Sequence, residues 1–272
     1  MSDALKAHDD DIEASRAPLL DHLSELRSRL MVVSATLVAA FIVSFFFAEP
    51  LFSLLIEPFK AAMAKVHPER VDQAIQLVYT GAFGFFGVKM TIALFAAIVV
   101  SFPIIAWQAY AFIAPGLYKR ERGAVAPFLI AAPVMFALGG AFVYYIAMTF
   151  ALEFALNQEV TRDGVSVSYL PKVEEYLGLV TTLVLAFGLF FQLPVVLSLL
   201  ARVGMIDAAM LRSGRRYAVV GIAAFAALVT PPDVLSMTVM AIPMYVLYEM
   251  SIWLVWAIAR GRDKEEAASA AS

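Results

Sequence analysis

Long apolar runs without charged residues constrain this chain more than any other feature. One lies between Arg29 and Glu49, and five more follow along the sequence. About 20 apolar residues wound as a helix cross a hydrocarbon core, because a helix rises about 1.5 Å per residue. We therefore predict six membrane spans, at about residues 30–48, 82–106, 124–149, 176–200, 217–230 and 235–259.

The composition agrees with a chain that is embedded in lipid. Of 272 residues, 62% are hydrophobic and 16% are charged, which is too apolar for an ordinary soluble domain. The predicted fold class is all-α: a polytopic membrane protein whose six helices form one curved, concave bundle over residues 18–260. Residues 1–17 are acidic and residues 261–272 are polar, and both are predicted to be disordered tails.

The distribution of lysine and arginine between the loops predicts the orientation. These residues concentrate in the amino-terminal segment, in the loops after the second and fourth runs and in the carboxy-terminal tail. They are sparser in the loops between. Cytoplasmic loops carry the excess of lysine and arginine. Six spans put both ends of the chain on one side, so both termini are predicted to be cytoplasmic.

The fifth and sixth runs are predicted to be short spans. The fifth offers about 14 residues before Thr230 and the Pro231–Pro232 pair, which makes about 21 Å of helix. A normal hydrocarbon core is about 30 Å thick. Such a helix must therefore thin the bilayer, stand nearly upright or hide among its neighbours.

Two polar side chains, Gln192 and Glu249, lie well inside apolar runs. Polar groups at membrane depth are costly unless they are paired or hydrated, which makes each one a candidate functional group. The alternative is that each side chain bonds to a neighbouring helix and only holds the packing. The residues alone leave both interpretations open.

The segment LDHLSELRSRL, which precedes the first run, predicts an amphipathic helix. Its leucines share one face, which we expect to lie against the membrane interface. Glu25 lies on the opposite face, toward the cytoplasm, and Arg27 lies at the border of the apolar stripe. Arg29 follows Glu25 by four residues, so an ordinary helical ion pair is an alternative use of that carboxylate.

Three stretches of the sequence resemble one family. They are PLLDHLSELRSRL before the first span, AWQAYAFIAPGLYKRERGA after the second, and TPPDVLSM followed by AIPMYVLYEM at the sixth. In this order and with matching spans, they resemble the TatC family, the multi-spanning receptor subunit of the twin-arginine protein translocase. The resemblance covers about residues 18–260.

The resemblance implies a function in protein export rather than an enzyme. Members bind signal peptides with a twin-arginine motif and, with single-span TatA/TatB-type membrane proteins, export folded proteins using the proton-motive force. The resemblance also implies self-association in a larger complex, without a cofactor, a metal or nucleic acid. It implies the bacterial plasma (inner) membrane, which an acidic amino-terminal segment unlike a transit peptide favours.

The resemblance also assigns roles to residues. Glu25 and Glu121 match the two carboxylates that face the arginine pair, and the planar fork of an arginine suits a carboxylate where lysine does not. By the residues alone, Glu121 is an ordinary member of a charge-mixed loop. The other matched positions are Arg27 and Phe112 in recognition, Pro58 and Asp233 on the outer side, Gln192 and Glu249 on the concave face, and Met237 in docking of a partner helix.

Two positions depart from the family pattern. Ser28 stands where the family often has a lysine, so one basic contact is missing. Met237 stands where some relatives carry glutamine, so docking there would rest on apolar packing between helices.

Three other classes of protein compete with this interpretation. A proton-coupled small-solute transporter would use Glu249 as its ion site, but such folds often carry inverted repeats, and none is evident here. An intramembrane enzyme would need a nucleophile–base pair or a set of metal ligands at depth, and the sequence shows neither. A scaffold that only anchors its partners is the third alternative.

Overall fold

The structure is a computed structural model that describes residues 2–70, 77–79, 84–113, 126–162, 165–167, 169–230 and 234–270. Side chains are described from Leu23 to Gly261, apart from those next to the gaps.

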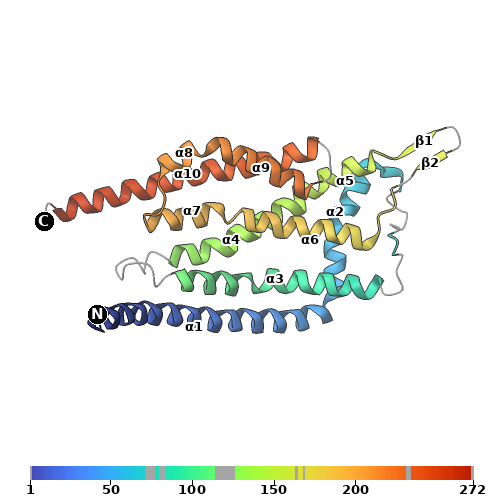
Figure 1. The fold of residues 1–272 in the computed structure, drawn as a ribbon. Coiled ribbons are helices and arrows are strands. Elements are labelled where there is room, and N and C mark those ends of the chain that lie inside the picture. Colours follow the sequence, from blue (N-terminus) through green and yellow to red (C-terminus); the bar gives the residue numbers. More distant parts are fainter. Residues whose placement is uncertain are drawn as a thin grey trace.

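Most helices of the described chain run along one long axis and form a bundle, and the second helix crosses that axis (Figure 1). In order they are α1 (Ser2–Phe46), α2 (Ala48–Val66), the short 3-10 turn η1 (Pro68–Arg70), α3 (Gly84–Ile113), α4 (Ala126–Phe142), the π-helical segment η4 (Val143–Ala147), α5 (Met148–Leu156), α6 (Val173–Phe190), α7 (Leu193–Arg202), α8 (Ala208–Ser213), α9 (Arg215–Val229) and α10 (Val234–Ala270). The N- and C-terminal ends of the chain lie at the same end of this bundle (Figure 1).

Five stretches of helix are long and apolar enough to cross a membrane within the described residues. They are Leu23–Phe46, Gly84–Phe112, Pro127–Leu156, Val173–Arg202 and Val234–Gly261. Each overlaps a predicted span, which confirms a polytopic helical membrane protein. The remaining predicted span corresponds to α9, whose 15 residues reach only about 22 Å.

The prediction of a short sixth span is wrong. The apolar part of α10 is 28 residues long, or about 42 Å of helix, which is enough to cross a bilayer of about 30 Å even when tilted. Glu249 lies within this stretch, and its carboxylate has partners in the structure, as described below.

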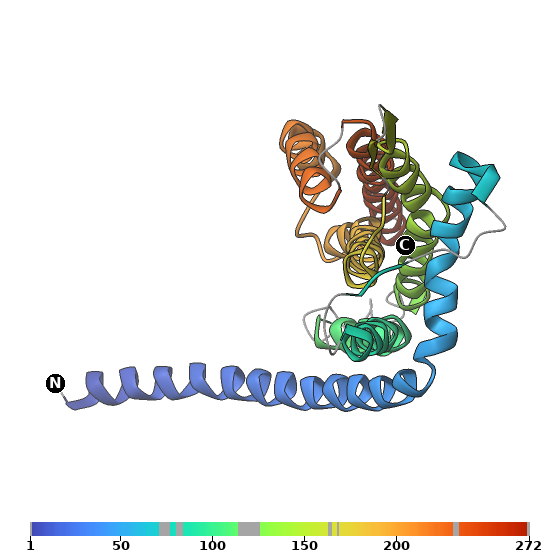
Figure 2. The same ribbon diagram turned by 90° about the vertical axis from the view of Figure 1, so that its right-hand side faces the viewer.

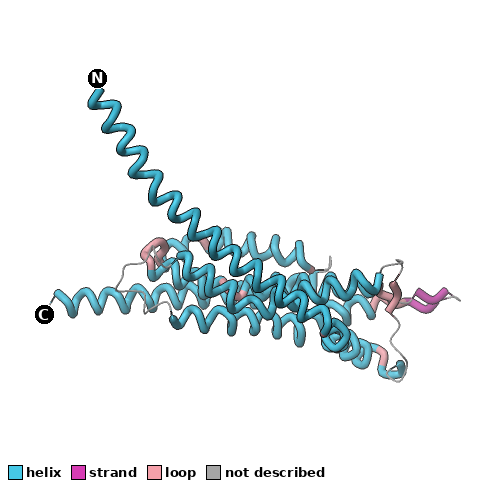
Figure 3. Tube along the Cα trace, turned by 90° about the horizontal axis from the view of Figure 1, so that it is seen from below, coloured by secondary structure: helices cyan, strands magenta, loops and turns pink. Residues whose placement is uncertain are grey.

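Both predicted tails are continued as helix, which differs from the disorder expected for them. Helix α1 begins at Ser2 and α10 ends at Ala270. Carboxylates near a helix N-terminus interact favourably with the helix dipole, and the alanines and glutamates of the other tail are good helix formers. Figures 2 and 3 show the N-terminal part of α1 extending away from the bundle.

Two segments expected as outer loops contain regular structure. Helix α2 buries Leu55, Phe59 and Ala62, spaced for one helix face, and packs beside α5. Figure 2 shows α2 rising past the ends of the other helices. After α5, β1 (Val160–Arg162) and β2 (Val165–Val167) pair antiparallel as a small hairpin. The prediction of an all-α chain is therefore correct for the bundle but misses this hairpin.

Helices α3, α4 and α6 pack closely in the middle of the bundle. Gly139 of α4 faces α6 so closely that a Cβ there would lie 2.7 Å from the carbonyl oxygen of Phe187. A Cβ on Gly188 would lie 2.6 Å from the ring of Phe136, which stacks on Phe102 of α3 at 3.9 Å between centroids. Small residues thus set the α4–α6 distance.

The fourth span is broken near its middle, as its proline suggests. Helix α6 ends at Phe190, and α7 begins at Leu193 with Pro194 in its first turn, where a missing N–H does no harm. Helix α7 then ends at Arg202, and two residues later Gly204 has a φ of 81°, in the left-handed region that glycine adopts most easily. The break between α6 and α7 sets the position of Gln192, and the break after α7 sets the position of α8.

Candidate functional site

Helix α1 lies at the edge of the bundle and packs mainly on α3. Its sheltered positions recur every three or four residues and begin with Glu25 and Arg29; they continue through Val33, Leu37, Ala40 and Ser44. The leucines of the other face are open, with Leu23 exposed to 60% and Leu30 to 54%. The leucine face is therefore free to meet lipid, as predicted, whereas Glu25 points into the α1–α3 junction rather than straight into the cytoplasm.

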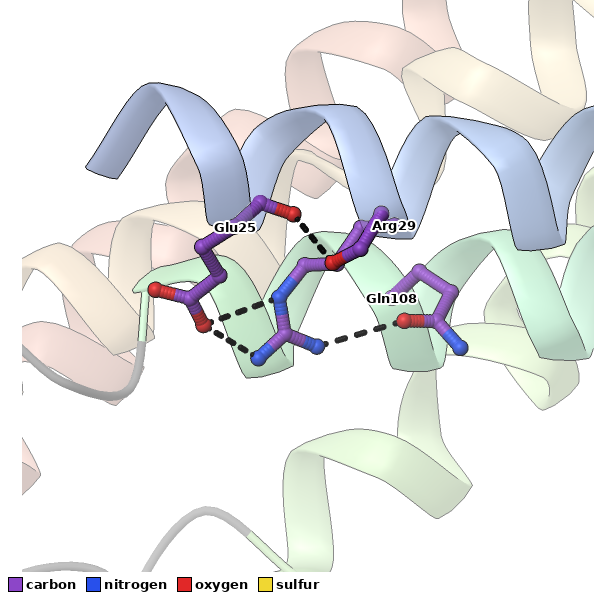
Figure 4. Close-up of polar contacts among 4 residues, drawn as sticks. Glu25, Arg29 and Gln108 are labelled. Atoms are coloured by element: carbon purple, nitrogen blue, oxygen red, sulfur yellow. Dashed lines mark hydrogen bonds and ion pairs between the residues drawn. The ribbon is translucent and has the colours of Figure 1, made fainter. Parts of the chain in front are cut away.

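A three-residue cluster connects α1 to α3 at this junction (Figure 4). The Arg29 guanidinium donates to Glu25 Oε1 from Nε at 3.0 Å and from Nη2 at 2.5 Å. Its Nη1 donates to Oε1 of Gln108, on the last turns of α3, at 3.2 Å. One planar guanidinium therefore joins a carboxylate on its own helix to an amide on the neighbouring one.

The charged side chains of the cluster are half buried. The Glu25 side chain is 31% exposed and that of Arg29 is 23% exposed. Both bonds from Arg29 end on Oε1, and Figure 4 shows the other carboxylate oxygen directed away from Arg29 and Gln108. Within the described residues, Oε2 accepts no hydrogen bond. Among the described residues, Glu25 thus has one oxygen held by Arg29 and one without a hydrogen-bond donor.

The neighbours of Glu25 on α1 have different surroundings. The Ser28 hydroxyl donates to the backbone carbonyl of Glu25 at 2.8 Å, a bond within the helix that carries no charge. Arg27 is exposed and borders a shallow groove of about 440 Å³ along α1 that Leu23 and Leu30 also line. Glu25 and Arg27 do not pair, as their angular separation on the helix predicts.

The second half of the predicted recognition site is described only in part. Phe112 lies one turn after Gln108 on α3 and is half buried. Glu121 falls within residues 114–125, outside the described residues. The structure therefore brings together Glu25, Arg29 and Gln108, with Phe112 on the next turn.

Gln192 lies at the break between α6 and α7. Its Nε2 donates to the backbone carbonyl of Ala132 on α4 at 2.9 Å. This bond joins two helices and gives the side-chain amide of Gln192 a partner, as expected if Gln192 holds the packing of neighbouring helices.

Glu249 is paired rather than isolated. Its Oε2 accepts from Nη2 of Arg215 at 2.7 Å, and its Oε1 accepts from the Tyr245 hydroxyl at 2.9 Å. Arg215 begins α9 and Glu249 lies about four turns into α10, so both are about 21 Å along their helices from the residues where α9 ends and α10 begins. The short α9 therefore sets the level at which this ion pair forms.

Helix α2, which carries the predicted outer-side residue Pro58, lies toward the end of the bundle opposite the termini (Figure 1). Pro58 is buried inside α2, which is connected to α3 by Lys89 Nζ and Glu49 Oε1 at 2.8 Å. The Lys89 ammonium holds the pKa of the exposed Glu49 carboxyl below its usual range. Met237 is half buried in the first turn of α10, and Asp233 lies outside the described residues.

Two members of these clusters escaped the sequence analysis. Gln108 is an amide near the end of a long apolar run, which is a signal of the same kind as the one that singled out Gln192. Arg215 was counted only toward the charge of its loop. Within the described residues, no group of three or more histidine, aspartate and glutamate side chains could hold a metal ion.

These features define a class: a polytopic helical membrane protein with a charged cluster where its first span approaches the end that holds both termini. The model of the family described as "Sec-independent protein translocase protein (TatC)" matches residues 21–243. The chain belongs to the TatC family, and it is a subunit of the Sec-independent, twin-arginine protein translocase.

Relatives and solved structures agree over almost the whole chain. The TatC protein of Magnetococcus marinus is 37% identical over 261 residues, which is 96% of this chain and 92% of that protein. The TatC protein of Escherichia coli strain K12 is 34% identical, with 92% of each chain covered. A crystal structure of the twin-arginine translocase receptor TatC matches with a TM-score of 0.72 and 32% identity, covering 88% of this chain and 99% of that one.

Proposed function

We propose that this chain is the signal-peptide receptor of its translocase and that Glu25 accepts a guanidinium of the twin-arginine motif. The observation that carries the proposal is the open oxygen of Glu25 in a carboxylate otherwise held by Arg29. Glu121 is the proposed second carboxylate, and Arg27 and Phe112 are the proposed neighbouring contacts.

The chemistry of the cluster suits an arginine better than a lysine. A guanidinium brings several donors in one plane, and a hydrogen bond between charged groups contributes about 1.5–3 kcal/mol. The half-sheltered position of Glu25 weakens screening by salt relative to an open surface. A lysine ammonium is a compact, strongly hydrated charge that cannot reproduce a planar contact.

The proposed topology has six spans and both termini in the cytoplasm, with α9 as the short fifth span. Two observations support it: the ends of the chain lie at one end of the bundle, and lysine and arginine concentrate in the segments predicted for that side. The proposed location is the bacterial plasma membrane. Pro58 and Asp233 would then face the outer side.

The proposed partners are signal peptides of folded precursors and single-span TatA/TatB-type proteins, in a complex in which this chain also self-associates. The exposed apolar surface of the spans supports contacts with other helices. Met237, at the outer end of α10, is the proposed docking position for a partner helix. The proton-motive force is the proposed energy source.

Gln192 and Glu249 are proposed to belong to the concave intramembrane wall. Their bonds to Ala132 and Arg215 give each polar group a partner, which supports a role in shaping that wall. The same pairing weakens the alternative of a proton-coupled small-solute transporter, which would need Glu249 as a free ion site.

Site-specific crosslinking tests the proposed receptor role. A photo-reactive residue at Ser28, which is exposed one turn after Glu25 and leaves that carboxylate in place, should crosslink to a precursor with a twin-arginine signal peptide and only weakly to the same precursor with a twin-lysine motif. A photo-reactive residue at Ser53 of α2, another exposed serine whose hydroxyl donates to the carbonyl of a glutamate on its own helix, is the matched control. Equal crosslinking of the two precursors at position 28 would contradict guanidinium recognition beside it.

A further inference from the structure

We propose that Gln108 is a positioning residue that governs how available Glu25 is to an incoming guanidinium, because it shares Arg29 with Glu25. This inference rests on the proposed receptor function. Its basis is one guanidinium that donates at the same time to Glu25 Oε1 and to Gln108 Oε1, across the contact between α1 and α3 (Figure 4).

Arg29 binds the carboxylate of Glu25, which is the group proposed to bind a precursor arginine. Oε1 already receives two donors from Arg29, so a symmetric two-oxygen fork from a second guanidinium is blocked while Arg29 stays in place. Two guanidinium groups on one carboxylate also leave an excess positive charge at a half-sheltered site. A precursor arginine that uses both oxygens of Glu25 must therefore displace Arg29.

Gln108 provides the place to which Arg29 can move. Its amide oxygen already lies 3.2 Å from Nη1 and is half buried beside the guanidinium. An arginine released from Glu25 with no other acceptor would be left sheltered and unpaired, which is costly. The amide keeps Arg29 bonded without adding a negative charge that would hold it away from Glu25 in the resting state.

Substitutions at Gln108 should therefore change precursor binding in opposite directions. Gln108→Leu removes the acceptor, so Arg29 stays on Glu25 and the affinity for a twin-arginine peptide should fall by about three- to tenfold. Gln108→Glu draws Arg29 away from Glu25, so that affinity should rise by a similar factor. A role in helix packing alone would weaken binding, or leave it unchanged, in both variants.

The test is equilibrium binding of a fluorescently labelled synthetic twin-arginine signal peptide to the full chain in nanodiscs of bacterial phospholipid. Gln158, exposed at the opposite end of the bundle, gives matched controls in Gln158→Leu and Gln158→Glu, which should bind as the parent does. The gain from Gln108→Glu should vanish when Glu25→Gln is also present. A gain that persists there would mean that the new carboxylate binds the peptide itself, which would overturn the inference.

The outcomes separate the two proposals. If Glu25→Gln alone leaves peptide binding unchanged, the receptor role proposed for Glu25 fails. If Glu25→Gln weakens binding but both Gln108 variants shift the affinity in the same direction or not at all, that role stands and the sharing of Arg29 fails. Thermal midpoints of all variants, measured in parallel, show that each protein is folded.

Discussion

The close approach of α4 and α6 predicts which of two glycine substitutions lowers the thermal stability more. In Gly139→Ala the new Cβ would lie 2.7 Å from the carbonyl oxygen of Phe187, a contact with backbone that no rotamer change relieves. The helices must separate by about 0.7 Å to restore ordinary contact, and overpacking of this kind costs about 1–3 kcal/mol. In Gly178→Ala, on α6, the new Cβ meets nothing within 4 Å.

The second variant isolates the packing effect. Both substitutions replace glycine by alanine inside a helix and gain about 1 kcal/mol of helix propensity. The difference between them therefore measures the overpacking alone. At about 2–4 °C per kcal/mol, Gly139→Ala should unfold roughly 2–12 °C below Gly178→Ala.

Thermal unfolding of the purified proteins in one detergent, at one scan rate, measures this difference. The scan rate must be fixed because unfolding of a membrane protein in detergent is often irreversible, and the midpoint then depends on it. Equal midpoints for the two variants would refute the argument that backbone contact at Gly139 sets the distance between α4 and α6.

Three further predictions concern charge and length. Glu249→Leu and Arg215→Met should each lower the thermal midpoint, and the double variant should recover part of the loss, since removing one partner leaves the charge of the other without its counter-charge; additive losses would contradict the pair. Because the Glu49 pKa is lowered by Lys89, their contact should persist above the ordinary carboxyl range and be lost as pH falls through the lowered pKa. Carboxyl NMR should therefore show a higher Glu49 midpoint in Lys89→Met; an unchanged midpoint would contradict the assignment. Inserting one helical turn into α9 should reduce the transport of a precursor protein into membrane vesicles that contain the partner proteins. Unchanged transport would show that the shortness of α9 has no role.

The membrane spans could be predicted because each depends on local composition. An apolar run between charged residues needs no knowledge of its neighbours, and the break at Pro194 follows from the missing N–H of proline. Helix α2 was missed although Leu55, Phe59 and Ala62 have helical spacing, because it lies between two predicted spans and was left as part of a loop. The hairpin was missed although an Asp-Gly pair stands between its strands, a frequent hairpin signal.

The clusters could be predicted only in part because their partners are far apart in the sequence. The Glu25–Arg29 pair follows from a spacing of four residues on one helix. The contact from Arg29 to Gln108 depends on which helix packs on α1, and the contact from Glu249 to Arg215 depends on the length of α9. Neither can be derived from a local pattern.

The most direct test of the central claim compares two peptides on two proteins. A twin-arginine signal peptide and its twin-lysine counterpart are titrated onto the parent chain and onto Glu25→Gln in nanodiscs. Loss of a charge-assisted hydrogen bond corresponds to about a tenfold or greater loss of affinity. Glu25→Gln should therefore lower the affinity for the twin-arginine peptide by that factor and reduce the difference in affinity between the two peptides. An equal loss for both peptides, or no loss for either, would contradict recognition of a guanidinium by Glu25.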